Sequence, residues 1–469
     1  MLRPLVVHEL RLAWRDPRTR TVTAAVTALA LAFGLAGAGA YQARHEEHEE
    51  LRTYGDERFS VQSADHPHAI AHRGYVVSRP PPVLGFLDAG LDGALGRWLT
   101  LDAHRTRPLE GARVGDLTRA PGAGRLDLGL LFTLVLPGFV VLLVHDAVAG
   151  ERRRGTFAML RAAGLQPGPW VAAKLAGAAA RVGLAVFLPA ALVAAALTAA
   201  LASDAWPRLV AWLGVQALGL AAWAALTLAL SAWVRDPPRA LGMGLMGWGL
   251  LTVVIPPLAS TAARAATRPP PPGVLSARLA TWAESAHAQT EDLRARAIRD
   301  VRRRHPEWDG NGDSPEVLDA VMLRLADREV AERMAALLDQ LAAEQDREAT
   351  LAAALSFASP GGLAQLAGSA VAASDLAQAR LAEAHYEGYR RELMAWINRW
   401  WAENGQGGFD AWSDTLKDLS SAPRPTPPRS PARLAWAGCR LPCLLLLVLC
   451  AVGGAAFALE SRRSLRGAA

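Results

Sequence analysis

Six runs of apolar residues, each long enough to cross a lipid bilayer, divide this chain into spans and loops. A membrane-spanning helix needs about 20 consecutive apolar residues, and the charged residues fall almost entirely between the runs. The pattern predicts an all-α polytopic membrane protein with six transmembrane helices and a helical extracytoplasmic domain. The expected transmembrane segments are 21–41, 128–148, 175–202, 209–234, 240–263 and 434–459.

The first apolar run admits a second interpretation, because Ala38-Gly39-Ala40 resembles the cleavage site of a secretory signal. The apolar region of such a signal has about 7–15 residues. The run from Thr21 to Tyr41 is longer, and a charged lead of 20 residues precedes it. We therefore interpret this run as an uncleaved membrane anchor.

Charge in the short loops orients the spans, because Lys and Arg concentrate on the cytoplasmic side of a membrane. If the N-terminus is inside, the cytoplasmic pieces hold 16 Lys and Arg against 5 Asp and Glu, and the outer pieces hold 32 basic against 37 acidic residues. Both termini are therefore expected to be cytoplasmic. The cytoplasmic pieces are 1–20, 149–181, 235–240 and the tail 460–469, and the outer pieces are 42–127 and 261–433.

Composition adds little to this topology. The net charge of +6 follows from the excess of basic residues in the cytoplasmic pieces and does not indicate a nucleic-acid partner. All three cysteines fall in the last apolar run, where they are expected to behave as small apolar residues facing lipid or neighbouring helices.

The two long outer segments differ in their patterns. In 42–127, apolar residues from Leu84 to Leu99 recur at helix-like intervals, which predicts a packed helix after the Pro-rich stretch at 79–82. The segment 264–433 is rich in Ala, Leu, Glu, Arg and Gln, which are strong helix formers. We expect it to form an antiparallel helical bundle that serves either as a recognition surface or as a structural cap.

The stretch that follows the second span is the most informative part of the sequence. It begins with an acidic residue, continues with a basic cluster and ends in an amphipathic helix. Glu151 is placed to lie at a helix N-terminus, where the helix dipole favours negative charge. Arg152, Arg153 and Arg154 either take part in this element or serve only to fix the topology. The residues that we single out here are Asp146, Gly150, Glu151, Arg152, Gly155, Thr156, Leu160 and Lys174.

In this order and spacing, these eight residues resemble the motif of the ABC-2 type transporter permease family. The sequence departs from the motif at Ala173, where the family often has Gly. The segment 1–20 also resembles the cytoplasmic amphipathic lead helix of these permeases. A narrower resemblance, to an uncharacterised bacterial subgroup with two large extracytoplasmic loops, rests on the stretch from His66 to Tyr75, on Arg79-Pro80 and on 86–92.

The resemblance implies that 149–174 is a cytoplasmic coupling helix that docks on a separate ABC ATPase subunit. It also implies that ATP and Mg are bound by that partner, with no cofactor on this chain, and that a second permease copy or a related permease completes the path. Permeases of this kind are mostly exporters. The sequence does not identify the substrate.

Each candidate enzymatic or metal-binding motif in the sequence lacks a required residue. The stretch from Gly150 to Thr156 lacks the Lys that precedes Thr in a phosphate-binding loop. A zinc-protease motif starting at His45 fails because its fifth residue is Glu49. A metal site at His66, His68 and His72 is less favoured than loop packing, because no carboxylate or Cys completes the ligand set.

Two other functions remain as alternatives. The chain is either a membrane-anchored receptor or assembly scaffold, whose outer domain binds a protein partner, or a stand-alone secondary carrier. The second alternative is weakened because the spans hold almost no charged residues and show no inverted repeat.

Overall fold

The fold is taken from a computed structural model of the chain. It describes residues 2–60, 67–101, 126–268, 290–405 and 419–466, together with 277, 281, 282 and 285. Within these residues the regular structure is helical except for one antiparallel pair of short strands. The predicted fold class, an all-α polytopic membrane protein, is therefore confirmed.

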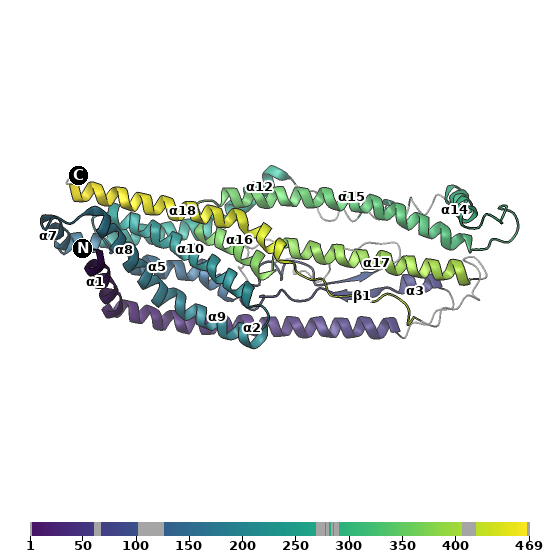
Figure 1. Cartoon of the computed structure of the whole chain (residues 1–469), viewed down its shortest axis with the longest axis horizontal. Helices are drawn as coiled ribbons and strands as arrows, with labels where there is room; N and C mark the ends of the chain where they lie inside the picture. The colour runs from purple at the N-terminus through teal and green to yellow at the C-terminus, as the bar shows by residue number, and fades with distance from the viewer. Residues whose placement is uncertain are drawn as a thin grey trace.

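Six helical stretches of the described residues are long and apolar enough to cross a membrane. Both termini lie at the same end of an elongated molecule, which we call the termini end; the opposite end is the far end (Figure 1). A short helix, α1 (Leu2–Arg15), precedes the first stretch. The stretches are Pro17–Ser60, Leu128–Arg153, Pro167–Leu201, Trp206–Trp233, Pro237–Thr267 and Ala432–Leu465.

Three of these stretches are single regular helices, and the other three are segmented. The helix α2 continues without a break well past its apolar part and leaves the bundle of spans (Figure 1). The single helices are α2 (Pro17–Ser60), α10 (Trp206–Trp233) and α18 (Ala432–Arg466). The segmented stretches begin with α4 (Leu128–Leu130), η2 (Leu131–Val135) and α5 (Leu136–Val144), and continue with α8 (Pro167–Val182), η3 (Gly183–Phe187), α9 (Leu188–Leu201), α11 (Pro237–Gly249), η4 (Leu250–Val254) and α12 (Ile255–Thr267).

Each segmented span contains one π-helical turn, and each turn is followed by a proline. Pro137, Pro189 and Pro256 lie at the second residue of the helix that follows η2, η3 and η4. A proline inside a helix lacks the backbone N–H, and its ring clashes with the carbonyl one turn earlier. A π-turn widens the helix at that point and relieves the clash. The three spans therefore cross the bundle without a break.

The helix α16 (Pro360–Ala372) packs among the spans, although it belongs to the segment 264–433 that was expected to stand outside the membrane. It packs against α10 and α18, and nearly all its residues are buried. No charged residue occurs between Glu348 and Asp375, so this helix can enter an apolar environment. The far part of the bundle thus contains a helix in addition to the six spans.

A buried polar cluster joins α16 to the spans. Asp88 is fully buried and accepts hydrogen bonds from Trp212 Nε1 of α10 and from Gln365 Nε2 of α16, both at 3.1 Å. Burial, and then the neighbouring Asp127 carboxyl, raises the pKa of Asp88 to about 7. Gly368 lies against this cluster, since a Cβ added there would be 2.7 Å from Asp88 Oδ2.

The far end consists of the extension of α2, two long helices and smaller elements that pack between them (Figure 1). Two hydrophobic clusters stabilise it, one around Phe59, Tyr75 and Tyr386 and one around Val301 and Trp401. The elements are α3 (Pro67–Arg73), β1 (Tyr75–Ser78), β2 (Trp98–Leu101), α14 (Thr290–Arg304), α15 (Leu318–Leu355) and α17 (Leu376–Asn404).

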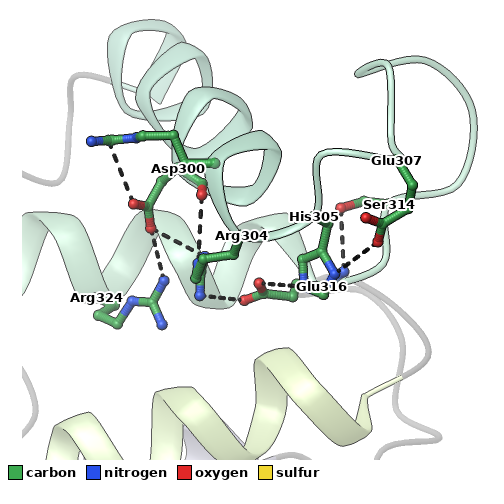
Figure 2. A network of polar contacts seen from close by, with 8 residues as sticks. Asp300, Arg304, His305, Glu307, Ser314, Glu316 and Arg324 are labelled. Carbon is green, nitrogen blue, oxygen red and sulfur yellow. Dashed lines mark hydrogen bonds and ion pairs between the residues drawn. The ribbon is translucent and has the colours of Figure 1, made fainter.

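Ion pairs hold the connection between α14 and α15 at the tip of the far end (Figure 2). Asp300 of α14 pairs with Arg304 at 3.1 Å and with Arg324 of α15 at 3.0 Å. Glu316 pairs with His305 at 3.1 Å and with Arg304 at 2.9 Å. These contacts link the loop to the end of α14 and link α14 to α15.

The helix predicted from the spacing of residues 84 to 99 is wrong. Leu84, Phe86 and Leu87 are fully buried, so the predicted packing is present. The backbone there makes successive turns and then enters β2, whose register pairs Trp98 with Ser78 of β1. The helical spacing arose by chance in a segment that packs irregularly on the end of the bundle.

The contact at Gly368 predicts opposite effects for two glycine-to-alanine changes. Gly368→Ala should lower the melting temperature of the purified protein, because its Cβ would lie 2.7 Å from Asp88 and 2.8 Å from Gln216. Gly388→Ala in α17 is the matched control, since nothing lies within 4 Å of the added Cβ. Inside a helix, alanine is more favourable than glycine by about 1 kcal/mol. Gly388→Ala should therefore raise the melting temperature slightly. Thermal unfolding of both variants in detergent tests this, and equal melting temperatures would contradict the packing of α16.

Candidate coupling site

The segment 149–174, expected to be one helix, is divided into three. It contains α6 (Ala149–Arg153), α7 (Thr156–Ala162) and the first half of α8. Gly155 separates α6 from α7 with a φ of 77°, and Gly164 follows α7 with a φ of 72°. Residues with side chains rarely adopt this left-handed conformation. The two glycines therefore fold the segment back on itself at the termini end of the molecule.

Lys174 of α8 lies between two carboxylates. Its Nζ is 2.7 Å from Glu9 Oε1 of α1 and also pairs with Glu151 of α6. The side chain of Lys174 is only 5% exposed. Lys174 does not extend its charge to the molecular surface. Its ammonium points inward and joins three helices.

Gly177 makes the contact with Glu9 possible. It lies one turn after Lys174 on α8, and a Cβ added there would be 2.8 Å from Glu9 Oε2 and 2.9 Å from Glu9 Cβ. The glycine leaves room for α1 to approach α8 at this point. Glu9 is 7% exposed, so both the acid and the base are removed from water together.

The first turn of α6 is held by side chains from two other spans. Ser231 Oγ of α10 accepts hydrogen bonds from the backbone N–H groups of Val148 at 3.0 Å and Ala149 at 3.2 Å. These donors have no partner within the helix itself. Arg152 then donates to the carbonyl of Ala232 on α10 and to Ser464 Oγ on α18. Of the arginine cluster, Arg152 is thus structural, while Arg153 and Arg154 are exposed.

Asp146 connects the turn after α5 to the start of α2. Its Oδ2 accepts a hydrogen bond of 2.9 Å from Arg18. Arg18 also binds Asp16, which lies between α1 and α2. Burial acts to raise the pKa of the Asp16 carboxyl, but the hydrogen bonds from Arg18 outweigh it and hold this pKa below its usual value. The pair keeps the junction of α1 and α2 charged and fixed.

The remaining residues of the motif shape the turn between α6 and α7. Gly150 lies in α6 where a Cβ would be 3.2 Å from the Arg154 guanidinium. Thr156 Oγ1 donates a hydrogen bond of 3.1 Å to the Glu151 carbonyl and so closes the turn. Leu160 is half-buried and lines a cleft of about 630 Å³ between α1, α7 and α8, together with Glu9, Glu151 and Lys174.

One face of α7 packs inward and the opposite face is exposed. Phe157 is buried against Trp170 of α8, with the ring centroids 5.6 Å apart, and the Arg152 guanidinium lies 5.3 Å from the Phe157 ring. Met159, in contrast, is 72% exposed. The helix α7 is among the outermost elements of the termini end (Figure 1). An exposed apolar side chain therefore lies on a short helix that is anchored to the bundle through Phe157.

Sequence reasoning missed four residues of this site, namely Glu9, Arg18, Ser231 and Ser464. Glu9 had a detectable signal, because it interrupts the stripe of Leu5 and Ala13 at helical spacing. An acid in such a stripe requires a buried basic partner. The other three are ordinary polar residues whose partners lie far away in the sequence.

No group of three or more His, Cys, Asp or Glu side chains suited to a metal ion occurs in the part of the chain that the structure describes. Of the three histidines considered and disfavoured as a metal site, His66 lies outside the described residues. His72 is exposed at the end of α3.

The comparison with known families assigns the chain. The family described as ABC-2 family transporter protein matches residues 4–458, which is nearly the whole chain. The protein therefore belongs to the ABC-2 transporter family and is a multi-pass membrane permease subunit of an ABC transporter. A search of curated proteins found no match.

The arrangement around Lys174 predicts an order of stability among three variants. Lys174→Met should lower the melting temperature more than Glu9→Gln or Glu151→Gln, because each glutamine variant leaves Lys174 one carboxylate. Removing one partner of a buried ion pair costs about 3–5 kcal/mol. Arg239→Met is the control, since that side chain is 83% exposed and its pair with Asp236 is 4.0 Å long. If Lys174→Met unfolds like the control, the lysine does not join the three helices.

Proposed function

We propose that this permease exports a substrate, with ATP and Mg bound by a separate cytoplasmic ABC ATPase that docks on α7. The proposal rests mainly on one observation: the α6–α7 segment exposes one face and is bound by its other face to several spans. The proposal names no substrate, because the spans consist largely of Ala, Leu and Val and carry few groups that recognise a ligand.

The charge distribution supports a cytoplasmic position for the termini end. The pieces 1–20, 149–181, 235–240 and 460–469 hold 16 basic against 5 acidic residues. Lys and Arg are retained on the cytoplasmic side of a membrane. On this orientation, in a bacterial inner membrane, α1 and α7 face the cytoplasm and the α15–α17 region extends outside.

The contacts of α6 support a role in transmitting force. Through Glu151 it is tied to Lys174 and hence to α8 and α1; through its N-terminus and Arg152 it is tied to α10 and α18. Packed helices move as rigid bodies and do not deform continuously. A partner that displaces α7 therefore acts on four different parts of the bundle at once.

The exposed face of α7 supports the position of the docking surface. Met159 is an exposed apolar side chain, and the same α6–α7 segment also exposes Arg153, Arg154 and Arg161. Apolar anchors with a charged rim are typical of protein interfaces. Two copies of this chain, or one copy and a related permease, would present two such surfaces to an ATPase dimer.

The docking surface is tested by placing a charge at its centre. Met159→Asp should weaken the retention of the ATPase about tenfold or more, because loss of an interface hot spot costs about 2 kcal/mol or more. The measurement is copurification of an ABC ATPase with this chain, in mild detergent, from the membranes in which the chain is naturally made.

Arg239→Asp is the matched control. Arg239 is 83% exposed and lies in the first turn of α11 (Pro237–Gly249), at the same end of the molecule. It should retain the ATPase at the level of the unaltered chain. Equal loss in both variants would indicate a general charge effect, and no loss in either would remove α7 from the interface.

A further inference from the structure

A long apolar groove runs along the outside of the bundle between α2 and the α8–α9 stretch. Its volume is about 780 Å³, and its walls include the exposed side chains of Leu31, Leu35, Leu188 and Leu192. This volume falls within the range of roughly 300–1,000 Å³ found for small-molecule sites. Both walls belong to apolar spans, so the groove opens toward the hydrocarbon of the membrane.

The termini end of the groove is polar. Arg20 lines it, and the only hydrogen bond that its guanidinium makes to a described residue is one of 3.4 Å to the Arg15 carbonyl. Thr19, which is 6% exposed, lines the same place, and its hydroxyl has no hydrogen-bond partner within the described ranges. Among the described residues, the Arg20 guanidinium thus has no carboxylate partner and the Thr19 hydroxyl has no hydrogen-bond partner at this end of the groove.

The groove has the length of one lipid molecule. From Arg20 to Leu35 the helix α2 rises by about 22 Å. Half of a bilayer, with its headgroup region included, is about 20–22 Å thick. A headgroup at Arg20 and Thr19 would therefore place the end of its acyl chain near Leu35.

The helix α1 places the polar end of the groove at the membrane surface. Its face with Val7, Leu10 and Trp14 is exposed although apolar, and Trp14 lines the groove. A helix with such a face lies in the membrane interface. On the proposed orientation this is the cytoplasmic leaflet, which carries the anionic lipids.

We propose that this groove binds one anionic phospholipid per chain, with the phosphate at Arg20 and Thr19 and an acyl chain along Leu31 and Leu188. The proposal uses the orientation given above and does not depend on ATPase docking. A second copy of the chain fits the groove less well. A two-fold contact centred on the groove would bring Arg20 against its own symmetry mate, and like charges repel.

Native mass spectrometry of the full-length protein, with added phosphatidylglycerol or phosphatidylcholine, tests the site. We expect the unaltered chain to retain one phosphatidylglycerol under conditions that remove phosphatidylcholine. Ala24→Trp should abolish this retention, because Ala24 is exposed and lines the groove. Ala28→Trp is the matched control, one turn further along α2, exposed and outside the groove.

A second pair of variants tests the charge. Arg20→Gln should reduce the preference for phosphatidylglycerol about tenfold, the scale expected for one charge-assisted hydrogen bond. Arg11→Gln, an exposed arginine of α1 outside the groove, should leave the preference unchanged.

Three results would overturn the proposal. Equal retention in Ala24→Trp and Ala28→Trp would mean unselective boundary lipid only. An unchanged preference in Arg20→Gln would remove the headgroup from Arg20. A change of oligomeric mass in Ala24→Trp, with lipid retention intact, would assign the groove to a contact between copies. Copurification of the ATPase, measured separately, distinguishes all of these from a failure of the proposed function.

Discussion

A buried ammonium group is stable only where carboxylates replace the water that it loses, and this constraint organises the termini end of the molecule. Lys174 meets it with Glu9 from α1 and Glu151 from α6. Because both acids lie beside this one base, α1 runs along α8 and Glu151 of α6 points inward. Gly177 provides the space for Glu9, and Ser231 and Arg152 bind α6 to α10 and α18.

The two ends of the bundle are stabilised by different means. At the termini end, charged side chains are paired across helices that are far apart in the sequence. At the other end of the spans, α16 packs against α10 and α18, and the Asp88 cluster ties it to α10. Each end is therefore a firmly packed unit, while the spans between them contain π-turns at three prolines. This combination suits a bundle whose two ends tilt relative to one another when one of them is displaced.

The spans could be predicted from the sequence because an uncharged apolar run of about 20 residues is typical of a helix that crosses a bilayer. The motif between Asp146 and Lys174 could also be found from the sequence, because the order and spacing of its residues can be recognised without knowledge of the fold. The break at Gly155 and the partner of Lys174 could not be found in this way. A glycine permits a left-handed turn without requiring one, and Glu9 lies 165 positions away from Lys174. The helix α16 was missed because its uncharged composition was averaged with the charged helices on either side.

We propose that α6 and Lys174 transmit motion from an ATPase to the opposite end of the spans. This motion can be measured in a chain whose native cysteines have been replaced and which carries spin labels at Ala200 of α9 and Ala265 of α12. Electron paramagnetic resonance then reports the distance between the two labels. Both positions are exposed. With the ATPase bound and ATP trapped, we predict a change in this distance for the unaltered chain and none for Lys174→Met, provided that the variant retains the ATPase. The same change in both proteins would contradict this mechanism.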